Sequence, residues 1–300
     1  MKILITGASG FLGENLVPYL TRDNRHTVCK LSLRTDWQRA NLNNFSTIIH
    51  LAGKAHDTKN TSHASEYFKV NTDLTKQLFD FFLNSNARSF IFISSVKAVA
   101  DSVDGVLCEE TAANPQTAYG QSKLMAEEYV LSRRDTKEKQ VYIFRPCMIH
   151  GPGNKGNLNL IYQLGKRGIP FPLAAFSNSR SFVSVENICF AIKEFLENDF
   201  PSGVYNIADN DPLSTNEIMK MIYEEHGFRN RLFYLPKSMI RFTAKVGDKF
   251  HLPLNTERLE KLTENFIVSN KKLIDTIGKD LPVTALDGMR FTIRSFKEQI

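Results

Sequence analysis

Three evenly spaced glycines stand close to the start of the chain, in the stretch TGASGFLG at residues 6–13. They follow an apolar run at 2–6 that is typical of a buried strand, and they precede a helix-like pattern over 11–20. Glycine at such a turn lets the backbone approach a phosphate, which then meets the N–H groups at the start of the helix. The spacing is G-x-x-G-x-x-G rather than the common G-x-G-x-x-G, but its place between strand and helix predicts a phosphate-binding loop.

The alternation of strand and helix continues through the first half of the chain. Further strands are expected at 26–33, 47–51, 89–95 and 140–146, with helices over 66–83 and from 118 onward. Apolar strands that alternate with helices predict a Rossmann-like doubly wound parallel sheet in an α/β fold. Ligands of such sheets bind at the carboxyl ends of the strands.

The pattern changes after Pro146. A Gly- and Asn-rich stretch at 151–159 leads into shorter segments, with one more strand expected at 203–209 and a helix over 215–227. We therefore predict a dinucleotide-binding domain at 1–153, to which 181–207 returns. A smaller, discontinuous substrate-binding lobe would be formed mainly by 154–300.

The end of the second expected strand bears on which dinucleotide would bind. NAD-binding sheets usually place an acidic residue there, about 20 residues after the glycines, to hold the adenine ribose. Here Arg34 stands near that end, and Asp36 follows. Arg34 would pair with the 2′-phosphate of NADP, whereas Asp36 would favour NAD. Both cofactors stay open, with a slight preference for NADP.

Tyr119 and Lys123 lie four residues apart in a stretch that is expected to be helical, so their side chains can meet on one face. A nearby ammonium favours the phenolate and lowers the pKa of a tyrosine, which would make Tyr119 a general acid/base near neutral pH. Such a pair is common by chance, and the remainder of the chain decides its meaning.

Composition disfavours several other classes of protein. The four cysteines are far apart and form no CxxC pair, so neither a disulfide framework nor a metal site is predicted. The net charge of +6 comes from dispersed residues, which does not indicate nucleic-acid binding. No apolar run approaches the roughly 20 residues that cross a bilayer, and the start does not resemble a secretory signal. We expect a cytoplasmic protein without a membrane partner.

Taken in order, the motifs of this chain resemble those of the extended short-chain dehydrogenase/reductase superfamily, and within it the NAD(P)-dependent nucleotide-sugar epimerase/dehydratase family. The resemblance covers nearly the whole chain. It rests on TGASGFLG at 6–13, IIHLAG at 48–53, Asn71 in FKVNTDLTKQL, FISS at 92–95, YGQSK at 119–123, RPCMIHGPG at 145–153 and RSFVSVENI at 180–188.

This resemblance implies a role for each matching residue. Tyr119 would be the catalytic acid/base, Lys123 its electrostatic partner, and Ser95, rather than Ser94, the hydroxyl that binds the reacting sugar oxygen. The residues expected to contact the cofactor are Arg34 and, by the resemblance, Gly7, Gly10, Phe11, Leu12, Leu51, Ala52, Gly53, Asn71, Tyr119, Lys123 and Pro146. The nucleotide sugar would contact Ser95, Asn157, Leu158, Arg180 and Arg258.

The residues after Ser95 narrow the activity. Dehydratases of this family carry an Asp-Glu pair there, whereas this chain has Val96-Lys97. The resemblance thus implies a 4-epimerase that acts on a UDP-hexose or UDP-N-acetylhexosamine through a transient 4-keto sugar, in surface-polysaccharide synthesis. An NADPH-dependent reductase of a 4-keto nucleotide sugar would use the same residues and stays open. A catalytically silent NADP-binding sensor is disfavoured because it has no need of an intact catalytic set.

The resemblance also carries two expectations about shape. The segment 34–45 is shorter than in typical members, which fit another helix and strand there, so it should hold little more than one turn. Relatives often dimerise through two helices that form a four-helix bundle. The helices that begin near 66 and 118 are therefore the candidates for a homodimer contact.

Overall fold

A computed structural model describes residues 1–39, 44–54, 63–134, 139–154, 158–250 and 255–298. Its centre is a six-stranded sheet in which every pairing is parallel. The strands are β1 (Lys2–Thr6), β2 (Thr27–Leu31), β3 (Thr47–His50), β4 (Ser89–Ile93), β6 (Gln140–Pro146) and β9 (Gly203–Ile207). Their order in the sheet is β2-β1-β3-β4-β6-β9, which confirms the predicted doubly wound α/β fold.

The direction of winding reverses at β1. The chain passes from β1 to the edge strand β2 on one side, and then crosses to β3 on the other side. Within the described part of 34–45, this crossover contains the single turn η1 (Trp37–Arg39), in line with the expectation for that segment. The loops that follow β1 and β3 therefore meet at the reversal point, where ligands of such sheets bind.

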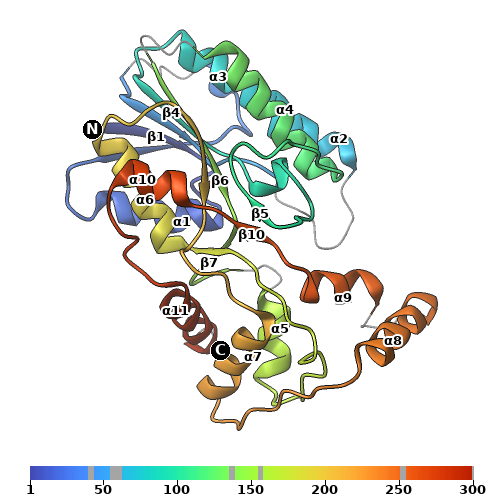
Figure 1. The fold of residues 1–300 in the computed structure, drawn as a ribbon. Helices are drawn as coiled ribbons and strands as arrows, with labels where there is room; N and C mark the ends of the chain where they lie inside the picture. The colour runs from blue at the N-terminus through green and yellow to red at the C-terminus, as the bar shows by residue number, and fades with distance from the viewer. Residues whose placement is uncertain (40–43, 55–62, 135–138, 155–157, 251–254, 299–300) are drawn as a thin grey trace.

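Helices cover both faces of the sheet (Figure 1). On one face, α1 (Phe11–Thr21) packs beside α6 (Val185–Glu197), and α10 (Lys271–Ile277) packs against β9. Leu12, Leu16 and Leu20 recur every four residues and form the buried side of α1. On the other face, α3 (Leu74–Leu83) lies beside α4 (Ala118–Arg133), over a core rich in phenylalanine.

The helix expected over 66–83 is formed by three consecutive segments. These are α2 (Ala64–Tyr67), the π-helical segment η2 (Phe68–Asp73) and α3. Short π-helical segments are rare and often occur at functional sites. Here the segment contains Asn71 and packs against α4, which carries Tyr119 and Lys123.

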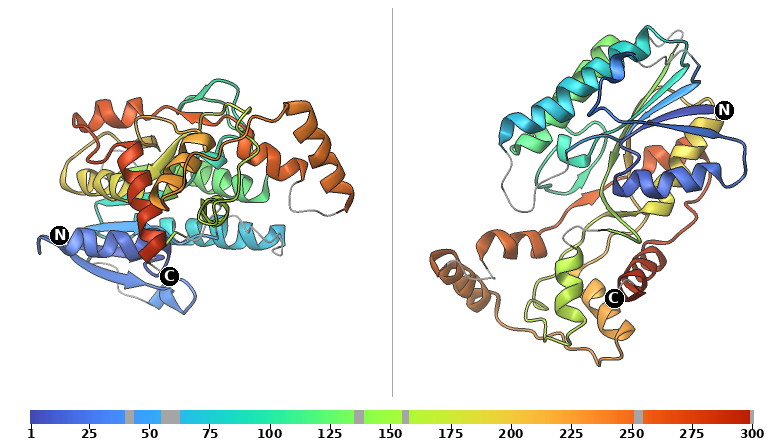
Figure 2. Two further views of the ribbon diagram at one scale, coloured as in Figure 1. Left: turned by 90° about the horizontal axis from the view of Figure 1, so that it is seen from below. Right: turned by 180° about the vertical axis from the view of Figure 1, so that it is seen from behind.

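A second hydrophobic core lies outside the central sheet. It is enclosed mainly by α5 (Leu158–Gly165), α7 (Thr215–Glu225), α8 (Lys237–Phe250), α9 (Thr256–Thr263) and α11 (Ala285–Glu298). Ser214 and Glu217 form a capping box at the start of α7, in which the side chain of each accepts from the backbone N–H of the other. Figure 2 shows these helices gathered at one end of the molecule, with α8 farthest out.

Two short parallel pairs lie beside the central sheet. They are β5 (Val106–Leu107) with β10 (Ile267–Val268), and β7 (Met148–His150) with β8 (Phe182–Ser184). A one-turn helix, η3 (Val96–Ala98), follows Ser95. The pairing of β9 with β6 brings 203–207 into the central sheet. The division into a dinucleotide-binding domain at 1–153 and a substrate-binding lobe at 154–300 stays a prediction. No helix in the described ranges is long and apolar enough to span a bilayer.

Candidate active site

The glycine loop after β1 packs directly against the loop after β3. Gly7 has φ +72°, and a Cβ there would lie 2.6 Å from the backbone nitrogen of Ala52. A Cβ at Gly13 would lie 2.5 Å from Cα of Ala8. Both positions therefore require glycine for close packing, whether or not a ligand is present.

Gly10 differs from the other two glycines because it is exposed and leaves room above the loop. It is the N-cap of α1, and no side chain caps the helix there. The first N–H groups of α1 are consequently available to an anion. Phe11 is half-buried and Leu12 is buried in the core, so these two residues would meet a phosphate through their backbone.

Buried hydrogen bonds hold the ends of β1 and β3 together. His50 lies between two hydroxyls, with Nδ1 2.7 Å from Thr6 Oγ1 and Nε2 2.8 Å from Thr75 Oγ1. The backbone N–H of Ala52 donates to the same Thr6 hydroxyl at 3.3 Å. Burial, with a smaller effect of the Lys123 charge, lowers the pKa of His50 to about 3.

Gly53, Asn71 and Lys123 form one wall of the site. A Cβ at Gly53 would lie 3.1 Å from both Asn71 Oδ1 and the Nζ of the buried Lys123, so a side chain at position 53 would crowd both groups. Asn71 is buried and pins the Lys54 backbone in both directions, accepting from its N–H at 2.7 Å and donating to its carbonyl at 3.1 Å. Asn71 thus shapes the loop, and any contact with cofactor stays a prediction.

Ser94 and Ser95 have different environments. Ser94 donates a hydrogen bond to Glu127, which also accepts from Arg145 Nη2 at 2.5 Å and Nε at 3.0 Å. All three side chains are buried. Ser95 instead caps η3 by accepting from the N–H of Lys97 at 3.2 Å, and its hydroxyl reaches Tyr119. Only Ser95 is therefore placed beside the tyrosine.

Tyr119 occupies the first turn of α4. Thr117 caps that helix by accepting from the N–H of Gly120 at 3.2 Å, and Asp101 in turn accepts from the Thr117 hydroxyl at 3.0 Å. The rings of Tyr119 and Tyr67 pack in a T-shaped arrangement, with their centroids 6.2 Å apart. These contacts hold the phenol beside Ser95.

The sequence predicted that the pKa of Tyr119 is lowered. For the protein without a bound dinucleotide, this prediction is wrong. Burial raises the pKa of Tyr119 above its usual value, and the Ser95 hydrogen bond only partly opposes this. The Lys123 ammonium donates instead to the carbonyl oxygen of Ile93 at 2.9 Å and lies 4.9 Å from the centre of the Phe92 ring. Burial lowers the pKa of Lys123 to about 8, against an opposing effect of Glu127.

Cationic side chains from distant parts of the chain gather near Cys147, the residue after Pro146. Arg180 and Lys97 both act electrostatically on Cys147 and on each other. Burial lowers the pKa of Lys97 and of Arg180. Lys97 donates to the carbonyl oxygen of Asp101 at 2.6 Å, and Arg180 donates to that of Lys261. The Glu264 charge acts on both cations and the Asp101 charge on Lys97, but among the described residues no carboxylate lies within ion-pair distance of either cation, so both can still attract an anion.

The remaining predicted residues are spread around this end of the sheet. Pro146 is the buried last residue of β6, and Arg34 is exposed beyond β2. Leu158 is buried in the second core at the start of α5, and Arg258 is exposed on α9. Asn157 lies outside the described residues.

Glu127 and Arg145 support the site but were not predicted from the sequence. Glu127 continues the spacing of Tyr119 and Lys123 by four more residues, so the same helical face carries all three. That spacing could have indicated Glu127. Its partner Arg145 comes from a strand, and only the packing of α4 on β6 brings the two charges together.

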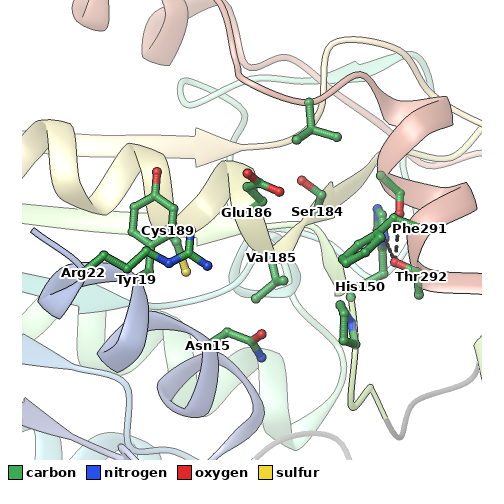
Figure 3. A pocket seen from close by; sticks show the side chains of 14 residues that line it. Asn15, Tyr19, Arg22, His150, Ser184, Val185, Glu186, Cys189, Phe291 and Thr292 are labelled. Atoms are coloured by element: carbon green, nitrogen blue, oxygen red, sulfur yellow. Dashed lines mark hydrogen bonds between the residues drawn. The ribbon is translucent and has the colours of Figure 1, made fainter. Parts of the chain in front are cut away.

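A cavity of about 290 Å³ lies elsewhere, between α1, α6 and α11 (Figure 3). Asn15, Tyr19, Arg22 and His150 are among its lining residues. Ser95, Tyr119 and Lys123 do not line it. Among the described residues, no group of three or more His, Cys, Asp or Glu side chains is arranged to hold a metal ion.

A sequence model of the NAD dependent epimerase/dehydratase family matches residues 3–208. This range is more than half of the chain and includes Ser95, Tyr119 and Lys123. The chain belongs to this family. It is therefore an NAD(P)-dependent enzyme of the short-chain dehydrogenase/reductase type, and the predicted family resemblance is confirmed.

Individual relatives agree with this assignment. A UDP-glucose 4-epimerase from Vibrio cholerae is 28% identical over 319 residues, covering 98% of this chain and 95% of the relative. The crystal structure of UDP-N-acetylglucosamine 4-epimerase from Bacillus cereus aligns over 99% of both chains, with a TM-score of 0.78 and 20% identity. MoeE5 in complex with UDP-glucuronic acid and NAD aligns over 100% of both chains, with a TM-score of 0.77 and 22% identity.

Proposed function

We propose that this protein is a nucleotide-sugar 4-epimerase that acts on a UDP-hexose or a UDP-N-acetylhexosamine. The observation that carries the proposal is the meeting of the Ser95 and Tyr119 hydroxyls beside Lys123, at the end of the sheet that also carries the glycine loop. Val96 and Lys97 stand where a dehydratase of this family has two acids, which favours epimerisation over loss of water.

The residues of the site suit a dinucleotide. The uncapped start of α1 would hold the pyrophosphate, because its N–H groups are free and Gly10 leaves the space above them open. Lys123 would hold the nicotinamide ribose from the space that Gly53 leaves free. The dinucleotide, when bound, supplies the hydride acceptor for sugar C4 and a positive charge that favours the phenolate of Tyr119.

Tyr119 would move the proton in both halves of the reaction. It would take the proton from the sugar 4-hydroxyl during oxidation, with Ser95 holding the same oxygen. Tyr119 then carries that proton and would return it to the same oxygen when the 4-keto sugar, turned over in the site, is reduced from its other face. Lys97 and Arg180 would bind the diphosphate of the substrate and so keep the nucleotide anchored while the sugar turns.

Arg34 favours a second candidate, a reductase that consumes NADPH to reduce a 4-keto nucleotide sugar. Its side chain is exposed beyond β2, where a 2′-phosphate of NADP would lie, and no acidic residue ends that strand. The same Ser95, Tyr119 and Lys123 would serve this reaction. The two candidates differ in whether reducing equivalents return to the same sugar.

Purified protein would be incubated separately with UDP-GlcNAc, UDP-GalNAc, UDP-glucose and UDP-galactose without added cofactor, and the sugars separated afterwards. Conversion within either pair supports a 4-epimerase that recycles a tightly held cofactor. If protein with demonstrated bound dinucleotide converts neither pair but oxidises NADPH in the presence of 4-keto nucleotide sugars, the reductase replaces the epimerase.

A further inference from the structure

Helix α8 carries a second apolar face that nothing in the described structure covers. Its inner residues Ile240 and Ala244 are buried in the second core. Met239, Phe242, Val246 and Phe250 recur at spacings of three and four, so they form a separate stripe along the helix. Phe242 is 67% exposed and Phe250 is 65% exposed, Met239 is exposed and Val246 is half-buried, so the stripe faces solvent mainly through its two phenylalanines.

The chain before α8 extends this apolar surface. Phe233 and Tyr234 are also exposed, so five of the large exposed hydrophobic residues fall within 233–250. Figures 1 and 2 show α8 at the outer extremity of the molecule in each view. Single exposed apolar residues are normal on the surface of a soluble protein, whereas a cluster of them indicates an interaction site.

Positive charges run along the edge of the stripe. Arg241, Lys245 and Lys249 precede Phe242, Val246 and Phe250 by one residue each, and all three cations are exposed. None of them forms an ion pair within the described part of the chain. The one acid of the helix, Asp248, is turned to the start of α9, where it accepts from the N–H of Thr256 at 2.9 Å.

We infer that α8 lies on the surface of a bilayer that carries anionic lipid headgroups. A surface-bound helix needs aromatic residues on one side and Lys or Arg beside them, and it needs no spanning length. The stripe would enter the headgroup region while the three cations attract phosphate groups. This inference departs from the expectation of no membrane partner, which considered only spanning segments and signal sequences.

The charges disfavour a protein occupant of the same face. Protein interfaces are depleted in lysine, and the stripe has lysines along its edge. A second copy of this chain would bring identical cationic rows toward each other in a two-fold contact, which is repulsive. An anionic lipid surface satisfies the apolar stripe and the cations at once.

The experiment uses a tryptophan as a reporter of lipid contact. The chain has one tryptophan, Trp37, which is buried, so a new exposed indole dominates any change in emission. Phe242→Trp would be mixed with phosphatidylcholine vesicles and with mixed phosphatidylcholine–phosphatidylglycerol vesicles. The matched control is Phe291→Trp, since Phe291 is 59% exposed on α11, outside the proposed face.

We expect a blue shift for Phe242→Trp with the anionic vesicles, a smaller shift with neutral vesicles, and loss of the shift at high salt. Phe242→Ser/Phe250→Ser should reduce co-sedimentation of the protein with anionic vesicles roughly tenfold or more, with epimerase turnover in vesicle-free buffer unchanged. Absence of a shift in folded Phe242→Trp would overturn the inference. So would unreduced vesicle binding by the double variant, or self-association that the double variant abolishes.

Discussion

The Lys123 ammonium donates a 2.9 Å hydrogen bond to the carbonyl oxygen of Ile93, the last residue of β4. Ser95 lies two residues beyond that carbonyl, and Tyr119 lies one helical turn before Lys123. One buried hydrogen bond therefore sets the distance between the strand that presents the serine and the helix that presents the tyrosine. The site depends on this contact even before a ligand arrives.

Replacement of Tyr119 by Phe should lower turnover by about 10²–10⁴-fold, because the substrate hydroxyl loses its proton acceptor. Binding of the dinucleotide should change little, since the ring stays packed beside Tyr67. Tyr129→Phe is the control on the same helix, where the lost hydroxyl donates to Asp80 at 2.7 Å. Near-normal turnover in Tyr119→Phe would remove Tyr119 from the catalytic role.

Replacement of Glu127 by Gln should lower the free energy of unfolding by about 3–5 kcal/mol, because it leaves the buried Arg145 charge unpaired. Glu127→Gln/Arg145→Met should recover part of the loss. Asp199→Asn, which breaks an exposed pair with Arg88, should cost less than about 1 kcal/mol. Urea denaturation measures all three variants, and equal costs for Glu127→Gln and Asp199→Asn would contradict the assigned burial.

The protein should lose stability in mild acid because of His50. The folded protein keeps this imidazole neutral down to a pKa of about 3, whereas the unfolded chain takes up a proton near 6.5. The contribution of the neutral His50 to the free energy of unfolding is therefore complete above pH 6.5. Below pH 6.5 it falls by up to about 1.4 kcal/mol per pH unit. Urea denaturation of the wild type and of His50→Gln would be measured at a series of pH values from 6.5 downward. The free energy of unfolding should fall more steeply with decreasing pH in the wild type than in the variant.

Arg34→Ala should weaken NADPH binding roughly tenfold and leave NADH binding nearly unchanged, because one charge-assisted hydrogen bond to the 2′-phosphate is lost. Calorimetric titration with each dinucleotide provides the measurement, with Arg88→Ala as a control for an exposed arginine elsewhere. A wild-type affinity for NAD far above that for NADP would end the preference for NADP.

Local patterns were enough to predict much of the first half of the chain. The 2–6 strand, the glycine loop and the helix after it are contiguous in sequence, and each has a short-range signal in apolar spacing or backbone freedom. The Tyr119–Lys123 pair follows from one helical turn in the same way. The motifs that carry the family resemblance are equally local, so the doubly wound fold could be predicted from them.

The structure was needed wherever a property depends on residues far apart in the chain. The approach of Lys97, Cys147 and Arg180 requires β4, β6 and the segment before β8 to end at one place. The direction of the Tyr119 pKa shift could be predicted only with knowledge of how deeply the ring is buried and of which group Lys123 contacts. That group is a backbone carbonyl oxygen.

Helix α8 shows the same division. Its sequence determines two apolar faces and a row of cations, because side-chain direction in a helix follows from spacing alone. Spacing does not say which face meets the core, since that depends on helices packed from other parts of the chain. Only the tertiary structure decided that Ile240 and Ala244 are buried while Phe242 and Phe250 face solvent.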